Sequence, residues 1–255
     1  MNTRIIATVG PSSWDYNVLK SLIRNGTNIV RLNFSHADIK QLIDLKKNLK
    51  KIKQETGHQA LIMQDLQGPR LRIGQLDQEI ELIDGEIYIF TAGPSSIANR
   101  EIQIDVPDLY EELQEGDSFF LSNGELELRI VEIKDKKIYA QVERGGLLMS
   151  HKGINLPNTR LRRSGLTPKD IADVEMALKC GGIDYIALSF VQSAADLQKL
   201  RKIIAGRPIR IIAKIERAVA MENIDEIIKE SDGIMVARGD LGIEMPLEDL
   251  PIIQK

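Results

Sequence analysis

The feature that most limits how this chain can fold is an alternation of short, nearly continuous apolar segments with longer amphipathic segments. The segments 5–10, 28–34 and 60–66 read IIATVG, NIVRLNF and ALIMQDL, and are rich in β-branched and other apolar residues. Between them, 15–25 and 39–56 repeat apolar residues at helical spacing. Strands that lack polar alternation are typical of a parallel sheet covered by helices, so the pattern predicts consecutive βα units.

The same alternation resumes in the second half of the chain. Thr167 and Pro168 are typical of a helix start, with the threonine as N-cap and the proline at the first helical position. Predicted helices at 170–179, 193–205 and 221–229 alternate with predicted strands at 185–191, 210–216 and 234–240. These six βα units lack a glycine-rich dinucleotide-binding fingerprint. We therefore expect an α/β fold, a (β/α) barrel of the TIM type that is incomplete at the C-terminus, because a full barrel has eight strands.

The pattern changes between residues 71 and 155, where apolar and polar residues alternate as they do along half-buried strands. The links Asp84-Gly85, Asn123-Gly124 and 134–137 suit hairpins and turns. We expect a small antiparallel β-barrel domain, inserted after the third strand. The predicted domains are the barrel, 1–70 together with 156–255, and the inserted β-barrel domain, 71–155.

The composition restricts the class of partner. The 255 residues include 34 Lys and Arg against 37 Asp and Glu, which gives a net charge of −3. This charge argues against nucleic acid or an anionic membrane as the main partner. The only cysteine, Cys180, cannot form an internal disulfide, and the sequence shows neither a secretory signal nor a long apolar span. We expect a cytoplasmic protein that binds no nucleic acid and no membrane.

Polar residues gather at the C-terminal ends of the predicted strands. They are Arg31, Asn33, Asp65, Ser189, Lys214, Glu216 and Asp240. In a (β/α) barrel these strand ends meet at one mouth, which is where barrel enzymes bind and convert their substrates. The arrangement therefore predicts an active site at the mouth.

The residue types at these positions favour phosphoryl or carboxyl chemistry. Lys214 and Glu216 share one face of a strand and, by spacing alone, fit a buried ion pair as well as a catalytic pair. Asp240 favours catalysis, because two carboxylates from adjacent strands can bind one Mg²⁺, and a lysine beside them would stabilise developing negative charge. Arg31 suits bidentate binding of phosphate, and Gly239 lets the backbone approach a ligand closely.

Seven segments, in order, resemble the pyruvate kinase family. They are IIATVGPSS, NIVRLNFSHAD, ALIMQDLQGPRLRIG, HKGINLP, DYIALSFVQSAADL, RIIAKIE and DGIMVARGDLGIEMP. The resemblance runs from Thr3 to Lys255 and includes the insertion, which is similar to the mobile lid domain of that family. It implies a glycolytic transferase that moves the phosphoryl group of phosphoenolpyruvate to ADP, giving pyruvate and ATP, with Mg²⁺ or Mn²⁺ as cofactor.

The resemblance also implies a role for each candidate residue. Glu216 and Asp240 would hold the metal, Lys214 would stabilise the transferring phosphoryl group, and Arg31 would bind the phosphate. Arg31, Lys214 and Asp240 would also contact the substrate. The other positions that match the family are Ser189 and Gly239 for the substrate, and Asn33, His36, Arg72 and Lys152 for the nucleotide.

A monovalent-cation site is implied at Asn33, Ser35, Asp65 and the carbonyl of Leu66. K⁺-dependent members of the family resemble one another in reading Asp-Thr-Lys-Gly-Pro-Glu along this strand end, whereas this sequence reads DLQGPR. Arg70 therefore stands where those members have a carboxylate, and it keeps its positive charge at all relevant pH values. This predicts that Arg70 acts as an internal cation and that K⁺ is not required.

The resemblance implies a longer protein as well. Family members continue past the position of Lys255 through two more barrel strands and a regulatory domain, so we expect an incomplete chain with a possible separate C-terminal half, in a homo-oligomeric family. Two alternatives stay open. One is a Mg²⁺-dependent aldolase or lyase of the phosphoenolpyruvate/pyruvate barrel group, which would lack the insertion. The other is a non-catalytic remnant that binds a partner.

Overall fold

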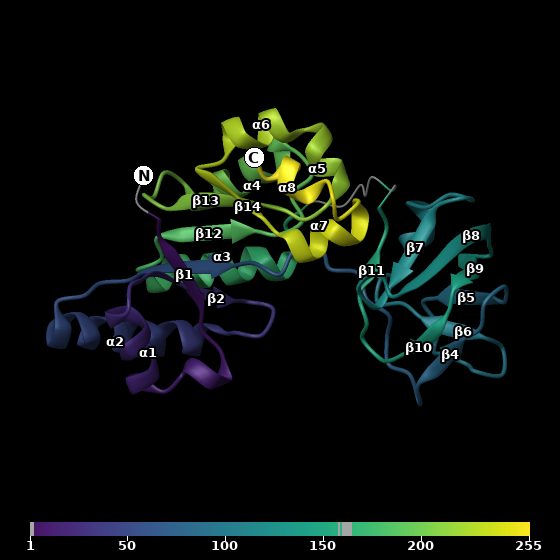
Figure 1. Cartoon of the computed structure of the whole chain (residues 1–255), viewed down its shortest axis with the longest axis horizontal. Coiled ribbons are helices and arrows are strands. Elements are labelled where there is room, and N and C mark those ends of the chain that lie inside the picture. The colour runs from purple at the N-terminus through teal and green to yellow at the C-terminus, as the bar shows by residue number, and fades with distance from the viewer. Residues whose placement is uncertain (1–2, 158, 160–164) are drawn as a thin grey trace. The chain divides into compact units, whose positions relative to one another are not determined.

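The structure, a computed structural model, describes residues 3–157, 159 and 165–255 (Figure 1). The chain divides into two compact units, each built from segments that are distant in the sequence. The first unit comprises Met1–Pro69, Ser164–Ile215 and Asn223–Met235, and the second comprises Arg70–Arg163, Glu216–Glu222 and Val236–Lys255. The domain boundaries predicted from the sequence, 1–70 with 156–255 and 71–155, stay a prediction.

A six-stranded sheet forms the centre of the first unit. Its strands in spatial order are β1 (Ile5–Thr8), β2 (Thr27–Asn33), β3 (Leu61–Asp65), β12 (Tyr185–Leu188), β13 (Arg210–Ile215) and β14 (Gly233–Val236). The registers of β1–β2, β2–β3, β3–β12 and β12–β13 are all parallel. The spatial order equals the order along the chain, which is the arrangement of an incomplete (β/α) barrel.

Helices connect these strands, and their caps follow from the sequence. They are η1 (Pro11–Ser13), α1 (Tyr16–Arg24), α2 (Ile39–Thr56), α3 (Pro168–Cys180), α4 (Ala194–Ile204) and α6 (Ile224–Glu230). Asp15 caps α1, while Asp38 and Thr167 begin α2 and α3 with reciprocal capping boxes. The N-cap predicted at Thr167 is confirmed. Within the described part of the chain, no helix combines the length and the apolar character needed to cross a membrane.

Two predicted elements differ from the structure. The helix predicted at 221–229 is divided at Asn223 into α5 (Ala218–Glu222) and α6: the backbone of Asn223 is not helical, and its side-chain amide donates to the Gln192 carbonyl. The strand predicted at 234–240 ends at Val236, because the Ala237 carbonyl accepts helical hydrogen bonds and starts α7 (Arg238–Glu244). Asp240 therefore lies in the first turn of a helix, and α8 (Leu250–Ile253) follows.

Burial in the sheet is uneven. Its middle holds a buried cluster that comprises Ile29, Met63, Tyr185, Ala187 and Ile212. The sequence predicts a buried first strand, but Ile5 and Ile6 are 51% and 43% exposed, and Ile234 of β14 is 43% exposed. Since β1 and β14 are the two ends of the sheet, their outer sides pair with no strand among the described residues. The prediction of burial is thus wrong at the edge, where neighbouring strands, rather than composition, decide exposure.

The second unit contains the predicted antiparallel domain. One sheet runs in the order β11 (Ile154–Asn155), β7 (Ser118–Leu121), β8 (Leu126–Lys134), β9 (Lys137–Arg144), β5 (Ile87–Thr91) and β6 (Glu101–Gln103), and β10 (Gly146–Leu148) pairs with β4 (Ile80–Leu82). The pairing is antiparallel except between β5 and β6. Phe90 and Phe119 lie in its buried core with ring centroids 4.6 Å apart. The short helices η2 (Leu109–Glu111) and η3 (Ser122–Gly124) connect strands.

Of two turns predicted in this domain, one joins a hairpin and the other does not. Asp135 and Lys136 form the two-residue loop of the β8–β9 hairpin, with φ values of 51° and 62° as a type I′ turn requires. Asp84-Gly85 is a turn but not a hairpin, because β4 before it pairs with β10, whereas β5 after it pairs with β9 and β6. Local turn chemistry therefore predicts that the chain bends, but not which strands pair.

Candidate active site

Asp65 lies between two cationic side chains at the C-terminal ends of the strands. From β2, Arg31 Nε donates to Asp65 Oδ2 at 2.7 Å, and Arg31 Nη2 lies 2.5 Å from the same oxygen. From β13, Lys214 Nζ lies 3.3 Å from Asp65 Oδ1. The Asp65 side chain is only 1% exposed. Because a buried carboxylate is costly unless it is paired, these two cations offset the cost of burying Asp65.

Ser189, just after β12, fixes the lysine. Its hydroxyl accepts a hydrogen bond from Lys214 Nζ at 2.7 Å and donates one to the Leu66 carbonyl, also at 2.7 Å. Both Ser189 and Lys214 are buried. We call Arg31, Asp65, Ser189 and Lys214 the cationic corner. Four strand ends that are distant in the sequence thus supply one connected cluster, as the sequence predicts for a barrel mouth.

In the cationic corner, Arg31 and Lys214 both pair with Asp65. The Lys214 side chain is 10% exposed, whereas that of Arg31 is 24% exposed and also donates to Thr8 Oγ1 at 2.7 Å. Arg31 is therefore accessible to a ligand, and Lys214 is more enclosed. Fixed cations in a site with little water interact strongly with phosphate and carboxylate groups. The geometry suits an anionic ligand.

An Asx turn ends β2 beside this corner. Asn33 Oδ1 accepts from the Ser35 N–H at 3.0 Å, and the Asn33 carbonyl accepts from the His36 N–H at 3.1 Å. Asn33 is also the register partner of Asp65. The structure thus brings Asn33, Ser35 and His36 together, with His36 exposed. Their assignment to a nucleotide or to a monovalent cation stays a prediction.

In the second unit, the two predicted metal carboxylates differ in burial. Glu216 is 3% exposed, whereas Asp240, in the first turn of α7, is half-buried. Burial raises the pKa of Glu244; Arg217 opposes this shift, and the negative charge of Asp240 adds to it. The negative charges of Asp240 and Glu244 therefore act on each other, and the binding of a metal by Glu216 and Asp240 stays a prediction.

The carboxylates alone would not complete such a site. Among the described residues, no three His, Cys, Asp or Glu side chains are arranged to hold a metal ion. Mg²⁺ commonly binds one or two protein carboxylates and takes its other ligands from water and substrate oxygens. Glu216 and Asp240 therefore fit Mg²⁺ better than an ion that needs a full set of protein ligands.

Sequence reasoning missed a buried ion pair at the start of α5. Arg217 Nε donates to Glu244 Oε1 at 3.3 Å, and Glu244 Oε2 accepts from the Ala218 N–H at 2.9 Å. Arg217 Nη2 also donates to the carbonyls of Leu156 and Thr159, each at 2.8 Å. These bonds attach α7 and the segment that follows β11 to the start of α5. No local sequence signal marks them, because each residue resembles an ordinary charged residue near a helix end.

The remaining predicted residues lie in the second unit. Arg72 Nη1 donates to the His151 carbonyl at 2.7 Å, and the Lys152 carbonyl accepts from the Ile73 N–H at 3.0 Å. Arg72 and Lys152 therefore lie on neighbouring antiparallel segments. A Cβ added to Gly239 would meet nothing within 4 Å, so packing does not require a glycine there. The role of Gly239 as a carboxylate binder stays a prediction.

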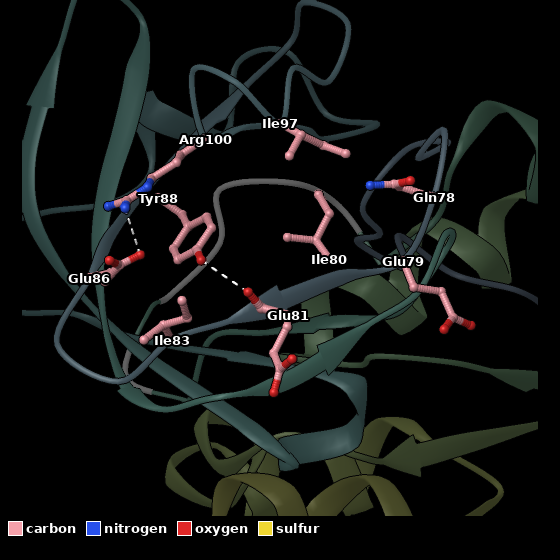
Figure 2. Close-up of a pocket in the computed structure, with 9 residues that line it drawn as sticks. All are labelled: Gln78, Glu79, Ile80, Glu81, Ile83, Glu86, Tyr88, Ile97 and Arg100. Atoms are coloured by element: carbon pink, nitrogen blue, oxygen red, sulfur yellow. Dashed lines mark hydrogen bonds and ion pairs between the residues drawn. The ribbon is translucent and has the colours of Figure 1, made fainter.

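A hollow in the β domain contains none of these residues (Figure 2). Two interactions join its lining residues: Arg100 Nη2 lies 2.8 Å from Glu86 Oε2, and the Tyr88 hydroxyl donates to the Glu81 carbonyl at 3.1 Å. The volume of about 250 Å³ is small beside ligand pockets of roughly 300 to 1,000 Å³. The hollow therefore does not compete with the cationic corner. Its lining residues are Gln78, Glu79, Ile80, Glu81, Ile83, Glu86, Tyr88, Ile97 and Arg100.

Comparison with known proteins identifies the family. A family model described as the pyruvate kinase barrel domain matches residues 1–255. The chain belongs to the pyruvate kinase family. The pyruvate kinases of Thermococcus litoralis and Clostridium perfringens are 36% and 37% identical to it, each over 99% of this chain and 54% of the relative. The crystal structure of a pyruvate kinase from Cryptosporidium parvum matches with a TM-score of 0.91 and 36% identity, over 99% of this chain and 54% of that one.

These matches confirm the resemblance to pyruvate kinase and the incomplete TIM-type barrel. The chain spans about half the length of the curated relatives it matches. A match to pyruvate kinases along the whole chain, insertion included, argues against the alternative of an aldolase or lyase of the phosphoenolpyruvate/pyruvate barrel group.

Removing the charge of Asp65 tests the cationic corner. Asp65→Asn takes the shared carboxylate from Arg31 and Lys214, so we expect the free energy of unfolding to fall by about 3 to 5 kcal/mol, as when one partner of a buried pair is removed. Urea denaturation followed by circular dichroism measures the loss. As a control, Asp44→Asn removes an exposed partner of Lys47 and should cost less than about 0.5 kcal/mol. Equal stabilities of the two variants would contradict the role of Asp65.

Proposed function

We propose that this chain carries the substrate- and metal-binding part of a pyruvate kinase, which transfers the phosphoryl group of phosphoenolpyruvate to ADP with Mg²⁺ and yields pyruvate and ATP in glycolysis. The observation that carries the proposal is the buried cationic corner at the strand ends. Phosphoenolpyruvate has a phosphate and a carboxylate, so its binding needs fixed positive charge. Membership of the pyruvate kinase family supports the same reaction, which we place in the cytoplasm.

Arg31 binds the phosphate oxygens of the substrate in this proposal. Its planar guanidinium can form parallel hydrogen bonds to two phosphate oxygens. Asp65 accepts from Nε and lies beside Nη2, so the guanidinium is oriented before the substrate arrives. Such preorganisation lowers the entropy cost of binding and alignment, which matters because phosphoryl transfer needs positioning and charge stabilisation rather than a protein nucleophile.

Lys214 stabilises the negative charge that develops on the transferring phosphoryl group and on the enolate oxygen. Its ammonium is held by Asp65 and by the Ser189 hydroxyl in a buried position. A cation that is already oriented needs no reorganisation when the charge develops, and its effect is stronger where water is scarce. Ser189 lines the same site, and we assign the substrate carboxylate to the backbone N–H of Gly239.

Glu216 and Asp240 are the proposed ligands of Mg²⁺, or of Mn²⁺ in its place. When bound, the ion would neutralise charge on substrate oxygens.

For ADP and ATP we propose Asn33 and His36 in the first unit, and Arg72 and Lys152 in the second. Burial lowers the pKa of Arg72, and the neighbouring positive charge of Arg70 lowers it further. The negative charge of Asp105 opposes this shift. The neighbouring guanidinium groups of Arg70 and Arg72 would attract a polyphosphate.

Metal binding tests the proposal without requiring turnover. Titration of the chain with Mn²⁺, followed by electron paramagnetic resonance, should show a divalent site that weakens by about tenfold or more in Glu216→Gln and in Asp240→Asn, since even indirect partners of metal ligands have effects of this size. Glu248→Gln, which removes an exposed carboxylate of the same unit, should leave the affinity unchanged. Wild-type affinity in both ligand variants would refute the metal assignment.

We further propose that Arg70 supplies the charge of a monovalent cation, so K⁺ is not required. Phosphoenolpyruvate should then bind the wild-type chain equally with and without about 100 mM K⁺ at constant ionic strength. Arg70→Glu should make the affinity increase several-fold with K⁺, and Arg70→Lys should behave like wild type because the charge is kept. A steep K⁺ dependence of the wild-type affinity would show that Arg70 is not the surrogate cation.

A further inference from the structure

Asp170 is a buried carboxylate to which none of the proposed functions assigns a role. It lies in the first turn of α3 and is 0% exposed. Its Oδ2 accepts from the N–H and the hydroxyl of Thr167, at 2.9 and 2.6 Å. The bond from the Thr167 N–H is the one that a capping box requires of the third helical residue. Its Oδ1 instead accepts from the N–H groups of Gln67 and Gly68, at 3.0 and 3.3 Å. Asp170 therefore bonds to the turn after β3 as well as to its own helix.

That turn is part of the cationic corner. Leu66, directly before Gln67, supplies the carbonyl that accepts from the Ser189 hydroxyl at 2.7 Å. The same hydroxyl accepts from Lys214 Nζ at 2.7 Å. Asp65, which pairs with both cations, is the next residue upstream. The position of the turn therefore sets where the hydroxyl, and through it the ammonium, can lie.

Gly68 packs too closely for the turn to shift on its own. Its φ is +69°, and a Cβ added there would lie 2.9 Å from Phe190 Cδ2, 3.0 Å from Ser189 Cβ and 3.1 Å from the Ser189 carbonyl oxygen. Phe190 itself has a φ of 54°, an unusual backbone conformation for a bulky residue. The turn after β3 and the end of β12 are thus in direct contact. A displacement of one must displace the other.

Lys169, the residue before Asp170, acts similarly on the end of β2. Its Nζ donates to the Phe34 carbonyl at 2.9 Å and to Asp173 Oδ2 at 2.6 Å. The Phe34 N–H in turn donates to the Asp65 carbonyl at 2.8 Å. Two consecutive residues of α3 therefore hold the ends of β2 and β3, the strands that supply Arg31 and Asp65.

We propose that Asp170 is a positioning residue of the cationic corner: its carboxylate fixes the Leu66–Gly68 turn, and the turn fixes the Ser189 hydroxyl and the Lys214 ammonium. For a capping box alone, one oxygen would suffice, as at Gln41, the third residue of α2, whose Oε1 accepts from the Asp38 N–H. The inference about substrate affinity rests on the proposed function. The inference about the turn does not, because it concerns contacts within the folded chain.

The test distinguishes the hydrogen bonds of Asp170 to its own helix cap from its hydrogen bonds to the Leu66–Gly68 turn. Asp170→Ala removes both sets of bonds, whereas Thr167→Val removes the hydroxyl of the cap and leaves Asp170 Oδ1 on Gln67 and Gly68. Amide hydrogen exchange by NMR should show that Gln67 and Gly68 lose about tenfold or more of their protection in Asp170→Ala, because hydrogen bonds to a charged group are among the stronger ones. Thr167→Val should keep that protection. Asp170→Asn, which retains an acceptor oxygen, should show an intermediate loss and serves if Asp170→Ala does not fold.

Substrate affinity provides the second readout. Phosphoenolpyruvate, followed by ³¹P NMR, should bind about tenfold more weakly to Asp170→Ala than to wild type, as expected from misplaced binding groups. Asp184→Asn is the matched control, because Asp184 Oδ2 accepts from the backbone N–H of Ile62 near the start of β3, away from the corner. It should bind like wild type.

Two results would overturn the inference. One is wild-type exchange of Gln67 and Gly68 in Asp170→Ala, and the other is equal phosphoenolpyruvate affinity in Asp170→Ala and Asp184→Asn. If the wild-type chain binds no phosphoenolpyruvate, the proposed function fails, and the exchange of Gln67 and Gly68 still decides the role of Asp170.

Discussion

Burial of a carboxylate that is 1% exposed costs free energy, and nearby cations compensate for its lost hydration. Arg31 and Lys214 do this for Asp65, the first from the adjacent strand and the second from a strand two places further along the sheet. The same contacts fix the positions of both cations. In the proposed function, stability and anion binding would therefore depend on the same three side chains.

The parallel sheet makes this cluster possible. Because every registered pair of its strands is parallel, the C-terminal ends of β2, β3, β12 and β13 lie along one edge. The helix α3 then joins two of these ends through Lys169 and Asp170. The ends of the strands are thus fixed by side-chain hydrogen bonds, beyond what the backbone ladder provides. Strand ends that are held in this way would supply the preorganised charge that the proposed function requires.

Sequence reasoning predicts what depends on local chemistry. The helices capped by Asp15 and Thr167, and the polar residues at the strand ends, follow from residue types and spacing. It could not predict the interruption at Asn223 or the bonds of Asp170 to the turn after β3, because the partners lie about 30 and 100 residues away in sequence. The exposed Ile5 was likewise unpredictable, since an apolar residue has the same composition signal at the edge and in the middle of a sheet.

The most direct test asks whether the metal carboxylates and the cationic corner act on one ligand. The measurement is the ³¹P relaxation of phosphoenolpyruvate in the presence of the chain and Mn²⁺, a paramagnetic ion. We expect strong enhancement in wild type, loss in Glu216→Gln because the metal is released, and loss in Arg31→Met because the phosphate is no longer bound. Enhancement that persists in Arg31→Met, or bound phosphoenolpyruvate whose phosphorus is unaffected by bound Mn²⁺, would contradict a pyruvate kinase site assembled from these residues.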